Sequence, residues 1–331
     1  MDKSVVKRVN TRPLVSVVVP FFNEEKAVDR FLETIIAVLE DIDTKWEIIC
    51  VDDGSSDHTL QHLLSAARAN PAISVLALSR NFGKESALTA GIESSGGDVV
   101  VLIDADLQDP PMLIGDMLEK WREGYDVVYG IRQSRNEDSL TKRVTAGVFY
   151  RIFNSLTSVP VPVNSGDFRL MDRRVADRLR ELPERTRFMK GLFAWLGYKS
   201  TAVYYDRPGR EEGKTTWSYW KLWNFALDGL TSFSTVPLRV WTYVGLIVSL
   251  MSFGYASFLI FRTFIEGVDL PGYASLMVVI LFLGGIQLIS LGVLGEYLGR
   301  VFIEVKQRPI YLIDRVYHFP NGETDAPDEP P

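Results

Sequence analysis

The chain contains the stretch VVVLIDAD at residues 99–106, in which five apolar residues run directly into Asp104 and Asp106. A short, unbroken apolar run is typical of a strand buried on both faces of a parallel sheet. The two carboxylates are two residues apart, so they point the same way into the crevice at the strand's carboxyl end, where open α/β sheets bind ligands. Oxygen ligands of this kind suit Mg²⁺ or Mn²⁺, usually bridged to phosphate. Taken alone, the pair is also typical of a solvated acidic turn.

Strands and helices alternate on both sides of this stretch. Apolar runs predict strands at 14–19, 47–51, 73–78, 98–103, 125–130 and 199–205, with an extended segment at 161–171. Helical spacing predicts helices at 24–40, 57–69, 84–94, 110–123, 142–156 and 173–182. Strands separated by helices imply a parallel sheet covered on both faces. We therefore expect one α/β domain at 14–212, preceded by a polar N-terminal segment at 1–13 that lacks the apolar core of a signal peptide.

The composition is that of an ordinary folded protein without a nucleic-acid partner. The 331 residues are 47% hydrophobic and 24% charged, and the formal net charge is −6. Nucleic-acid-binding domains usually carry a surface rich in Lys and Arg. The negative net charge of this chain therefore argues against a general role in binding nucleic acid. The single cysteine, Cys50, lies in an apolar run, so we expect a small core residue without an internal disulfide, in a reducing compartment.

Two long apolar runs follow the α/β domain. Residues 240–261 and 270–295 contain no charged side chain, and each exceeds the roughly 20 residues that span a bilayer as a helix. They predict transmembrane helices at 240–262 and 270–295 within a 240–300 unit, although a buried core helix is the alternative. Lys and Arg gather outside the pair, so both termini, the α/β domain and the 301–331 segment are expected in the cytoplasm, which favours the bacterial inner membrane. The tail from 321 is expected to be disordered.

The segment at 213–239, between the α/β domain and the first span, is rich in aromatic residues. Trp217, Trp220 and Trp223 alternate with charged residues such as Lys221. Aromatic rings favour the headgroup level of a bilayer, so the segment predicts amphipathic helices lying on the cytoplasmic leaflet. Ordinary packing of these rings against the α/β domain is the alternative.

Each of the first four predicted strands ends in a polar motif. These are PFFNEE at 20–25, DDGSSD at 52–57, SRNFGK at 79–84 and DADLQDPP at 104–111. Together, in this order and spacing, they resemble glycosyltransferase family 2 with a GT-A (Rossmann-like) fold. The GKTTWS stretch at 213–218 and the two spans are similar to the polyisoprenyl-phosphate hexosyltransferases, such as bactoprenol glucosyltransferases and dolichyl-phosphate mannose synthase. The resemblance covers residues 14 to 312.

This resemblance implies a nucleotide-sugar site at the strand ends. The residues expected to bind the donor are Pro20, Asn23, Glu24, Asp52, Asp53, Asn81, Lys84, Asp104 and Gln108. Asp53, or its neighbour Asp52, can accept the uracil N3–H, and Glu24 can accept from ribose hydroxyls. Asp106 is the main expected metal ligand, with Asp104 supporting it directly or through the ribose. The ion, Mg²⁺ or Mn²⁺, would neutralise charge on the leaving UDP. The structural alternatives are that Asp53 and Gly54 form an ordinary turn, and that Lys84 is an exposed lysine at the start of a helix.

The acceptor site is expected to be basic. Arg207, Arg210, Lys214 and Arg132 are candidates to hold phosphate through charge-assisted hydrogen bonds, although the first three could instead face anionic lipid. Family members often place a carboxylate base opposite the donor, and Asp167 lies where it is expected. A phosphate monoester, with a second pKa of about 6, is already ionised at neutral pH. Asp167 therefore acts either as the base or as an orienting group.

The residues and the resemblance together predict a membrane enzyme with hexosyltransferase activity. It would transfer a single hexose, glucose first, from a UDP-sugar to undecaprenyl or another polyprenyl phosphate with inversion, for a cell-envelope glycan. The Gln-x-x-Arg-Trp signature of processive synthases is absent from the sequence. The alternatives are another donor sugar or GDP-mannose, or a non-catalytic lipid-sugar carrier or flippase. With two spans, a flippase would need a homo-oligomer, and a homo-oligomeric enzyme is left open as well.

Overall fold

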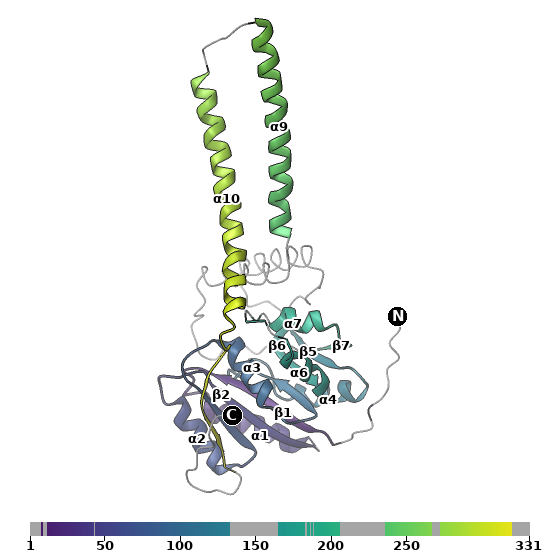
Figure 1. Cartoon of the computed structure of the whole chain (residues 1–331). Coiled ribbons are helices and arrows are strands. Elements are labelled where there is room, and N and C mark those ends of the chain that lie inside the picture. Colours follow the sequence, from purple (N-terminus) through teal and green to yellow (C-terminus); the bar gives the residue numbers. More distant parts are fainter. Residues whose placement is uncertain are drawn as a thin grey trace.

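The computed structural model describes residues 8, 12–42, 44–132, 165–182, 184, 185, 187, 189–205, 236–266 and 272–319. It consists of an α/β domain from which two long helices project (Figure 1). The helix predicted at 142–156, the interfacial segment up to residue 235 and the C-terminal tail lie outside the described residues.

An eight-stranded sheet organises the α/β domain, with the strand order β7-β5-β6-β4-β1-β2-β3-β8. The strands are β1 (Leu14–Phe21), β2 (Lys45–Asp52), β3 (Ile73–Leu78), β4 (Val99–Leu102), β5 (Val127–Arg132), β6 (Ser165–Asp172), β7 (Ser200–Tyr205) and β8 (Ile313–His318). The neighbours β4, β1, β2 and β3 are parallel, as the sequence predicts. Their carboxyl ends therefore meet at one edge of the sheet.

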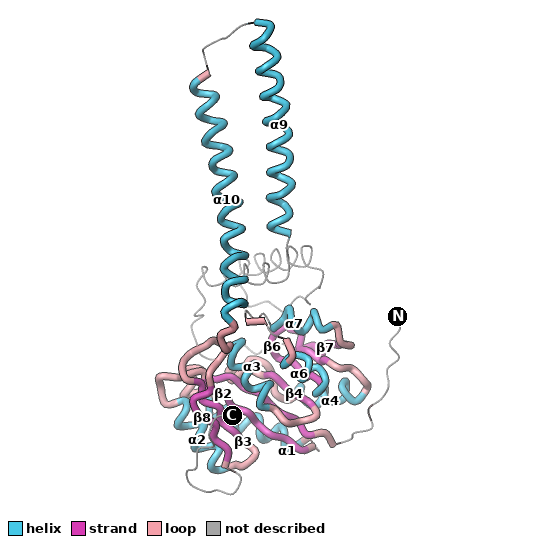
Figure 2. The backbone as a smooth tube through the Cα atoms, viewed as in Figure 1, coloured by secondary structure: helices cyan, strands magenta, loops and turns pink. Residues whose placement is uncertain are grey.

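Helices cover both faces of the sheet, as Figure 2 shows for the helix and strand layers. They are α1 (Val28–Asp41), α2 (Thr59–Ala69), α3 (Lys84–Ser94), α4 (Leu113–Arg122), α6 (Arg173–Arg180) and α7 (Met189–Leu196). Three of them start later than predicted, among them α2, which begins at Thr59 rather than at residue 57. The segment from Glu24 to Ala27 is a turn before α1, and the two prolines at 110–111 precede α4 rather than open it. Asp57 accepts from the Thr59 N–H at 3.0 Å and so caps the start of α2.

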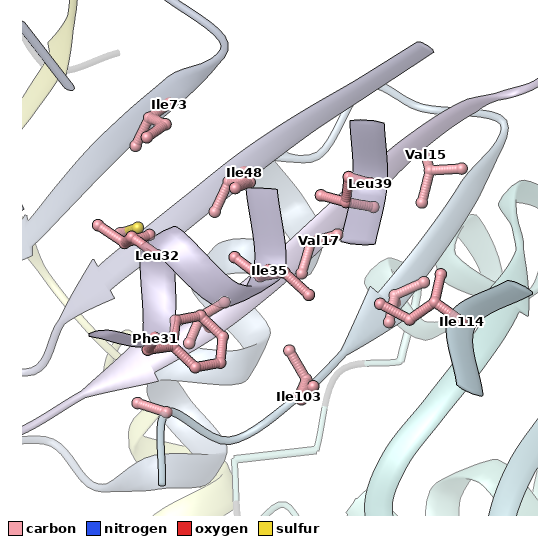
Figure 3. Close-up of a cluster of buried hydrophobic side chains, with 14 of the residues drawn as sticks. Val15, Val17, Phe31, Leu32, Ile35, Leu39, Ile48, Ile73, Ile103 and Ile114 are labelled. Carbon is pink, nitrogen blue, oxygen red and sulfur yellow. The ribbon is translucent and has the colours of Figure 1, made fainter. Parts of the chain in front are cut away.

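The core is divided between the two faces because successive strand residues point to opposite sides. On one face, Val15 and Val17 of β1 pack with Ile35 and Leu39 of α1 (Figure 3). On the other face, Val18 packs in the cluster that α3, α6 and α7 cover. The predicted core role of Cys50 is confirmed, since its side chain is fully buried.

The sheet is mixed rather than wholly parallel. β6 is antiparallel to both β4 and β5, and β8 is antiparallel to β3. The C-terminal segment that the sequence leaves as a cytoplasmic extension therefore forms an edge strand of the α/β domain. Phe319, just after β8, is buried in the core and stacks under the Arg68 guanidinium, so this strand covers the β3 edge.

The two projecting helices are α9 (Val236–Glu266) and α10 (Tyr273–Lys306). Within the described residues, one stretch, Phe282–Lys306, is long and apolar enough to cross a membrane by length and composition, and a shorter apolar stretch lies at Tyr243–Tyr255. The first span predicted at 240–262 and the second at 270–295 both fall in helices, but α10 continues eleven residues further. It enters the α/β domain directly, and Glu304 near its end accepts from the Arg185 N–H at 2.9 Å.

Candidate active site

A cavity of about 270 Å³ opens at the carboxyl ends of β1, β2, β3 and β4. Its walls come from the four loops that carry the polar motifs. The lining residues are Pro20, Phe21, Phe22, Glu24, Asp53, Asn81, Gly83, Lys84, Asp104, Ala105 and Asp106. Seven of the residues predicted from the sequence thus meet in one place, because parallel neighbouring strands deliver their following loops to the same edge.

Each of these four loops contains one residue with a positive φ. The residues are Asn23 (54°), Gly54 (66°), Gly83 (97°) and Leu107 (52°). Left-handed backbone is easy for glycine and costs other residues about 1 kcal/mol or more. Leu107 adopts it between the acidic pair and α4. Such strained turns concentrate at functional sites, where the surrounding structure holds them.

Gly54 also allows the loops after β2 and β3 to touch. A Cβ at this position would lie 2.4 Å from the Arg80 carbonyl carbon and 2.6 Å from the Asn81 nitrogen. Only glycine fits this approach without moving backbone. The contact brings Asp53 beside the next loop, where its two carboxylate oxygens accept from the N–H groups of Phe82 (2.7 Å) and Gly83 (2.9 Å).

The two adjacent aspartates after β2 have different environments. Both side chains are buried, but Asp53 lines the cavity, whereas Asp52 lies outside its lining and accepts from the Ser55 N–H at 3.3 Å. Burial raises the pKa of Asp53, partly offset by its two backbone hydrogen bonds. Each carboxylate oxygen keeps further lone-pair capacity after one backbone bond. The sequence left the choice between the two open, and the geometry favours Asp53 as the group that meets a ligand.

Two other predicted donor residues lie beside the cavity rather than in its wall. Asn23 joins the loops after β1 and β2, since its Oδ1 accepts from the Ser56 N–H at 2.8 Å. Gln108 is buried, and its backbone N–H donates to Asp106 at 3.1 Å. Both positions support the loops of the cavity, and their predicted contact with donor remains a prediction.

The cavity wall carries four carboxylates. Burial raises the pKa of Glu24, and the charges of Asp106, Asp57 and Asp104 raise it further, so these groups are close enough to repel one another. A divalent cation would relieve that repulsion. Among the described residues, no three His, Cys, Asp or Glu side chains come close enough to hold an ion by themselves. The carboxylates of Asp104 and Asp106 therefore fit Mg²⁺ or Mn²⁺ that takes its other ligands from phosphate and water.

Lys84 joins the acidic pair to Asp167. Its Nζ lies 2.7 Å from the nearer oxygen of Asp104 and 2.6 Å from Oδ2 of Asp167. The Lys190 Nζ, on α7, lies 3.8 Å from the other oxygen of Asp167. Burial alone raises the pKa of Asp167, but the charges of Lys84 and Lys190 outweigh it and hold that pKa well below its usual range. Asp167 is thus a firmly ionised carboxylate.

Arg169 supports the same region from beneath. Its guanidinium stacks 3.8 Å from the centre of the Phe193 ring and donates to the carbonyl oxygens of Gly166 (3.0 Å) and Asp167 (3.4 Å). Burial lowers the pKa of Arg169 to about 10. This arrangement fixes the main chain that carries Asp167, so the guanidinium contacts backbone oxygen rather than the Asp167 carboxylate.

Of the four basic residues predicted for the acceptor, Arg132 is described and the other three, Arg207, Arg210 and Lys214, lie outside the described residues. The Arg132 guanidinium donates to Tyr205 Oη at 3.3 Å and to buried Asp109 at 3.4 Å. Tyr205 Oη in turn donates to Asp109. The negative charge of Asp109 partly neutralises the Arg132 guanidinium, which weakens its attraction for a phosphate. Phosphate binding by Arg132 remains a prediction.

Sequence reasoning missed several residues of this region. They are Lys190, Tyr205, Glu85 and Asp109; Lys190 and Tyr205 lie outside every motif and reach the site through long-range packing. Burial, reinforced by the charge of Asp167, raises the pKa of Glu85 to about 7. A local signal existed for two of them, since Glu85 follows the SRNFGK motif directly and Asp109 lies within the DADLQDPP motif.

Comparison with known proteins identifies the family. The model for glycosyl transferase family 2 matches residues 16–180, and the GtrB C-terminal hairpin matches residues 236–301. A protein named as an uncharacterized glycosyltransferase in Synechocystis sp. is 56% identical over 303 residues, which cover 92% of this chain and 95% of that one. The chain belongs to glycosyltransferase family 2.

Other relatives of this glycosyltransferase have more specific names. The prophage bactoprenol glucosyl transferase homolog of Escherichia coli K12 is 47% identical, covering 91% of this chain and 99% of its own. The bactoprenol glucosyl transferase of Shigella phage SfII is also 47% identical, covering 91% and 97%. Among solved structures, the glucosyl-3-phosphoglycerate synthase of Mycobacterium tuberculosis with Mn²⁺ and UDP-glucose covers 66% of this chain and 78% of its own, at 20% identity and a TM-score of 0.44. Similarity at that level does not indicate which donor or metal ion this chain binds.

Proposed function

We propose that this glycosyltransferase moves one glucose from UDP-glucose to a polyprenyl phosphate, giving a polyprenyl monophosphate sugar and UDP. The observation that carries the proposal is the cavity where Asp53 and the Asp104–Asp106 pair meet at the carboxyl edge of the sheet. A nucleoside diphosphate needs a group for the base at one end and cation ligands at the other. The relatives named bactoprenol glucosyl transferase support the lipid acceptor and the glucose.

The donor is expected to lie across the strand ends. Asp53 accepts the uracil N3–H, while Glu24 accepts from the ribose hydroxyls and Asn81 approaches the base. Pro20 and Asn23 shape the loop after β1, and Gln108 supports Asp106 from its own loop. With the base at Asp53 and the ribose at Glu24, the diphosphate would lie beside Asp104 and Asp106, which would hold the divalent ion. When bound there, the ion supplies positive charge to the diphosphate as UDP leaves.

The transfer itself is a single displacement at the anomeric carbon. An oxygen of the acceptor phosphate forms the new bond to that carbon, the bond from the carbon to the donor's β-phosphate oxygen breaks, and its electron pair leaves with UDP. Attack from the side opposite the leaving group inverts the anomeric configuration. Arg132 and the basic residues Arg207, Arg210 and Lys214 would attract the acceptor phosphate.

Asp167 is the orienting group of this scheme rather than a base. A carboxylate held at 2.6 Å by Lys84 has a depressed pKa and little tendency to take a proton. The acceptor arrives with little need for a base, since a phosphate monoester has its second pKa at about 6. Asp167 would instead fix Lys84 and Lys190 beside the point where the two phosphates approach.

This role makes a prediction about pH. We expect Asp167→Asn to lower kcat by about tenfold, the loss of one charged hydrogen-bond partner, without changing the shape of the pH profile. Activity of the wild type should fall below about pH 6 as the acceptor phosphate gains a proton, and the variant should fall in the same way. Initial rates from pH 5 to 9 measure this. Glu85→Gln is the control, because burial and the charge of Asp167 raise the pKa of Glu85 to about 7, within that range. If the fall in activity at low pH disappears in Asp167→Asn but not in Glu85→Gln, Asp167 is the base.

The membrane arrangement is a second part of the proposal. We place both apolar helices, α9 and α10, across the bilayer, with the α/β domain and both termini in the cytoplasm. The match of residues 236–301 to a C-terminal hairpin supports two spans, and β8 keeps the chain after α10 on the side of the α/β domain.

Accessibility in intact cells and inverted vesicles tests this topology. A tag before Met1 and a tag after Pro331 should be cleaved by protease from the cytoplasmic side only, and a tag at Gly267 from the outer side only. The charge distribution around the helices is the physical reason. Termini on opposite faces would remove one span.

A donor panel tests the reaction. Purified full-length protein with undecaprenyl phosphate and labelled UDP-glucose, other UDP-hexoses or GDP-mannose should transfer from UDP-glucose with the highest kcat/KM. Preference for another donor would replace glucose in the proposal. Failure of every donor, together with movement of a preformed lipid-linked sugar across vesicles, would favour the carrier or flippase.

A further inference from the structure

Asp104 lies two residues beyond the end of β4, and Asp167 lies in β6, the antiparallel neighbour of β4. The β4–β6 register pairs Val99 with Asp172 and Leu102 with Arg169. Continuing it two residues beyond Leu102 places Asp104 opposite Asp167. Like charges directly opposite one another on neighbouring strands are destabilising. The chain therefore brings two carboxylates together at the edge of the donor cavity, and something must offset their repulsion.

Lys84 is the side chain that offsets it. Its Nζ contacts both carboxylates, at 2.7 and 2.6 Å, while 40% of the side chain stays exposed toward the cavity it lines. Lys84 is the first residue of α3, so the rigid start of a helix delivers it. Two ion pairs to opposite charges favour the charged ammonium form of this side chain.

An ammonium at this place competes with a metal ion. A divalent ion on Asp104 and Asp106 would share the Asp104 carboxylate with Lys84, and two cations on one carboxylate repel each other strongly in a partly buried site. A nucleotide diphosphate changes the balance, because its negative oxygens can take both the ion and the ammonium as partners. These charges therefore favour an ion that enters with the nucleotide over an ion that enters alone.

We propose that Lys84 is a positioning residue that stands in for the metal ion in the free enzyme and makes tight metal binding depend on the nucleotide diphosphate. The proposal rests on the proposed metal site at Asp104 and Asp106. When the donor and ion are bound, Lys84 stays on Asp167 and orients that carboxylate beside the reacting phosphates. A purely structural salt bridge at the start of α3 would give no such link between metal and nucleotide.

Direct metal binding tests this. Full-length protein in detergent is titrated with Mn²⁺ while the free ion is followed by electron paramagnetic resonance, with and without UDP. The wild type should bind Mn²⁺ weakly alone and much more tightly with UDP. Lys84→Met should bind Mn²⁺ alone about tenfold more tightly, because a competing charge is gone, and UDP should add less. Lys84→Arg keeps the charge and should retain the wild-type pattern.

Matched variants separate this from loss of the fold. Lys120→Met removes an exposed lysine of α4 that pairs with Glu123, and it should leave Mn²⁺ binding unchanged. Lys84→Gln replaces Lys84→Met if the latter unfolds at lower temperature. In the transfer assay, Lys84→Met should lower kcat while the KM for donor changes little, as expected for a residue that acts through Asp167.

The outcomes are distinct. Unchanged or weaker Mn²⁺ binding by both Lys84→Met and Lys84→Gln without UDP would overturn the role of Lys84 and leave the proposed metal site standing. Absence of Mn²⁺ binding by the wild type, even with UDP, would overturn the metal site as well. Tighter binding of the ion alone with a smaller gain from UDP supports the proposal.

Discussion

Asp106→Asn is expected to lower transfer by about a thousandfold or more, because the ion that carries charge from the diphosphate is worth several kcal/mol to the transition state. The amide keeps the size of the side chain and can still accept from the Gln108 N–H, which now contacts Asp106 at 3.1 Å. The fold should therefore persist while the negative charge at the cavity is lost. Labelled glucose transfer to undecaprenyl phosphate measures the rate, and Mn²⁺ titration with UDP measures the loss of the ion.

Asp116→Asn is the matched control for this variant. Asp116 is an exposed acid on α4, the helix that follows the same loop, and its loss should leave transfer unchanged. Chelation of divalent ions should reproduce the effect of Asp106→Asn in the wild type, and added Mg²⁺ or Mn²⁺ should reverse it. Full activity in excess chelator, or near-normal activity of Asp106→Asn, would contradict a metal at this pair.

The cavity was predictable because its parts are local. Each strand from β1 to β4 is a short apolar run, and each is followed at once by its polar motif, so the order of strands and motifs alone delivers the motifs to one edge. The sequence names Asp53 first and Asp52 as its alternative, but the position of Asp53 in the cavity wall was not predictable. It depends on the approach of the β3 loop at Gly54, which a sequence pattern does not contain.

The rest of the site depends on contacts between distant segments. β8 looks like a polar tail in the sequence, and only pairing with β3 and burial of Phe319 make it a strand. The bulged pairing of β5 with β6 brings Arg132 near Asp109, and α7 brings Lys190 to Asp167. Strand preference depends on tertiary packing more than helix preference does, so such an edge strand leaves little local signal.

The end of α10 illustrates a boundary that charge patterns place imperfectly. The sequence ends the second span at residue 295, where Glu296 interrupts the apolar run. In the structure Glu296 accepts from Arg300 one turn later at 3.0 Å, so the two charges form an i,i+4 pair and the helix continues to Lys306. The helix ends at Lys306, and residues 307–312 then link α10 to β8 of the α/β domain.

Gly54→Ala is expected to weaken UDP binding by about ten- to a hundredfold, because the strain and the backbone overlap together cost a few kcal/mol. Its Cβ would lie 2.4 Å from the Arg80 carbonyl carbon at a φ of 66°, so the loops after β2 and β3 must separate. Separation takes the N–H groups of Phe82 and Gly83 away from Asp53, the group proposed to accept the uracil. Calorimetric titration with UDP measures the affinity.

Gly115→Ala provides the comparison for that variant. Gly115 lies inside α4 with open space where a Cβ would be, and alanine favours a helix, so UDP affinity should stay at the wild-type value and thermal stability should rise slightly. Asp53→Ala should match Gly54→Ala in UDP affinity, since the first removes the carboxylate proposed to accept the uracil and the second removes the N–H groups that hold it in place. Asp53→Ala leaves the contact between the two loops intact. If Gly54→Ala binds UDP normally and Asp53→Ala does not, the carboxylate recognises the base without help from the β3 loop. If both bind UDP normally, the uracil lies elsewhere in the cavity.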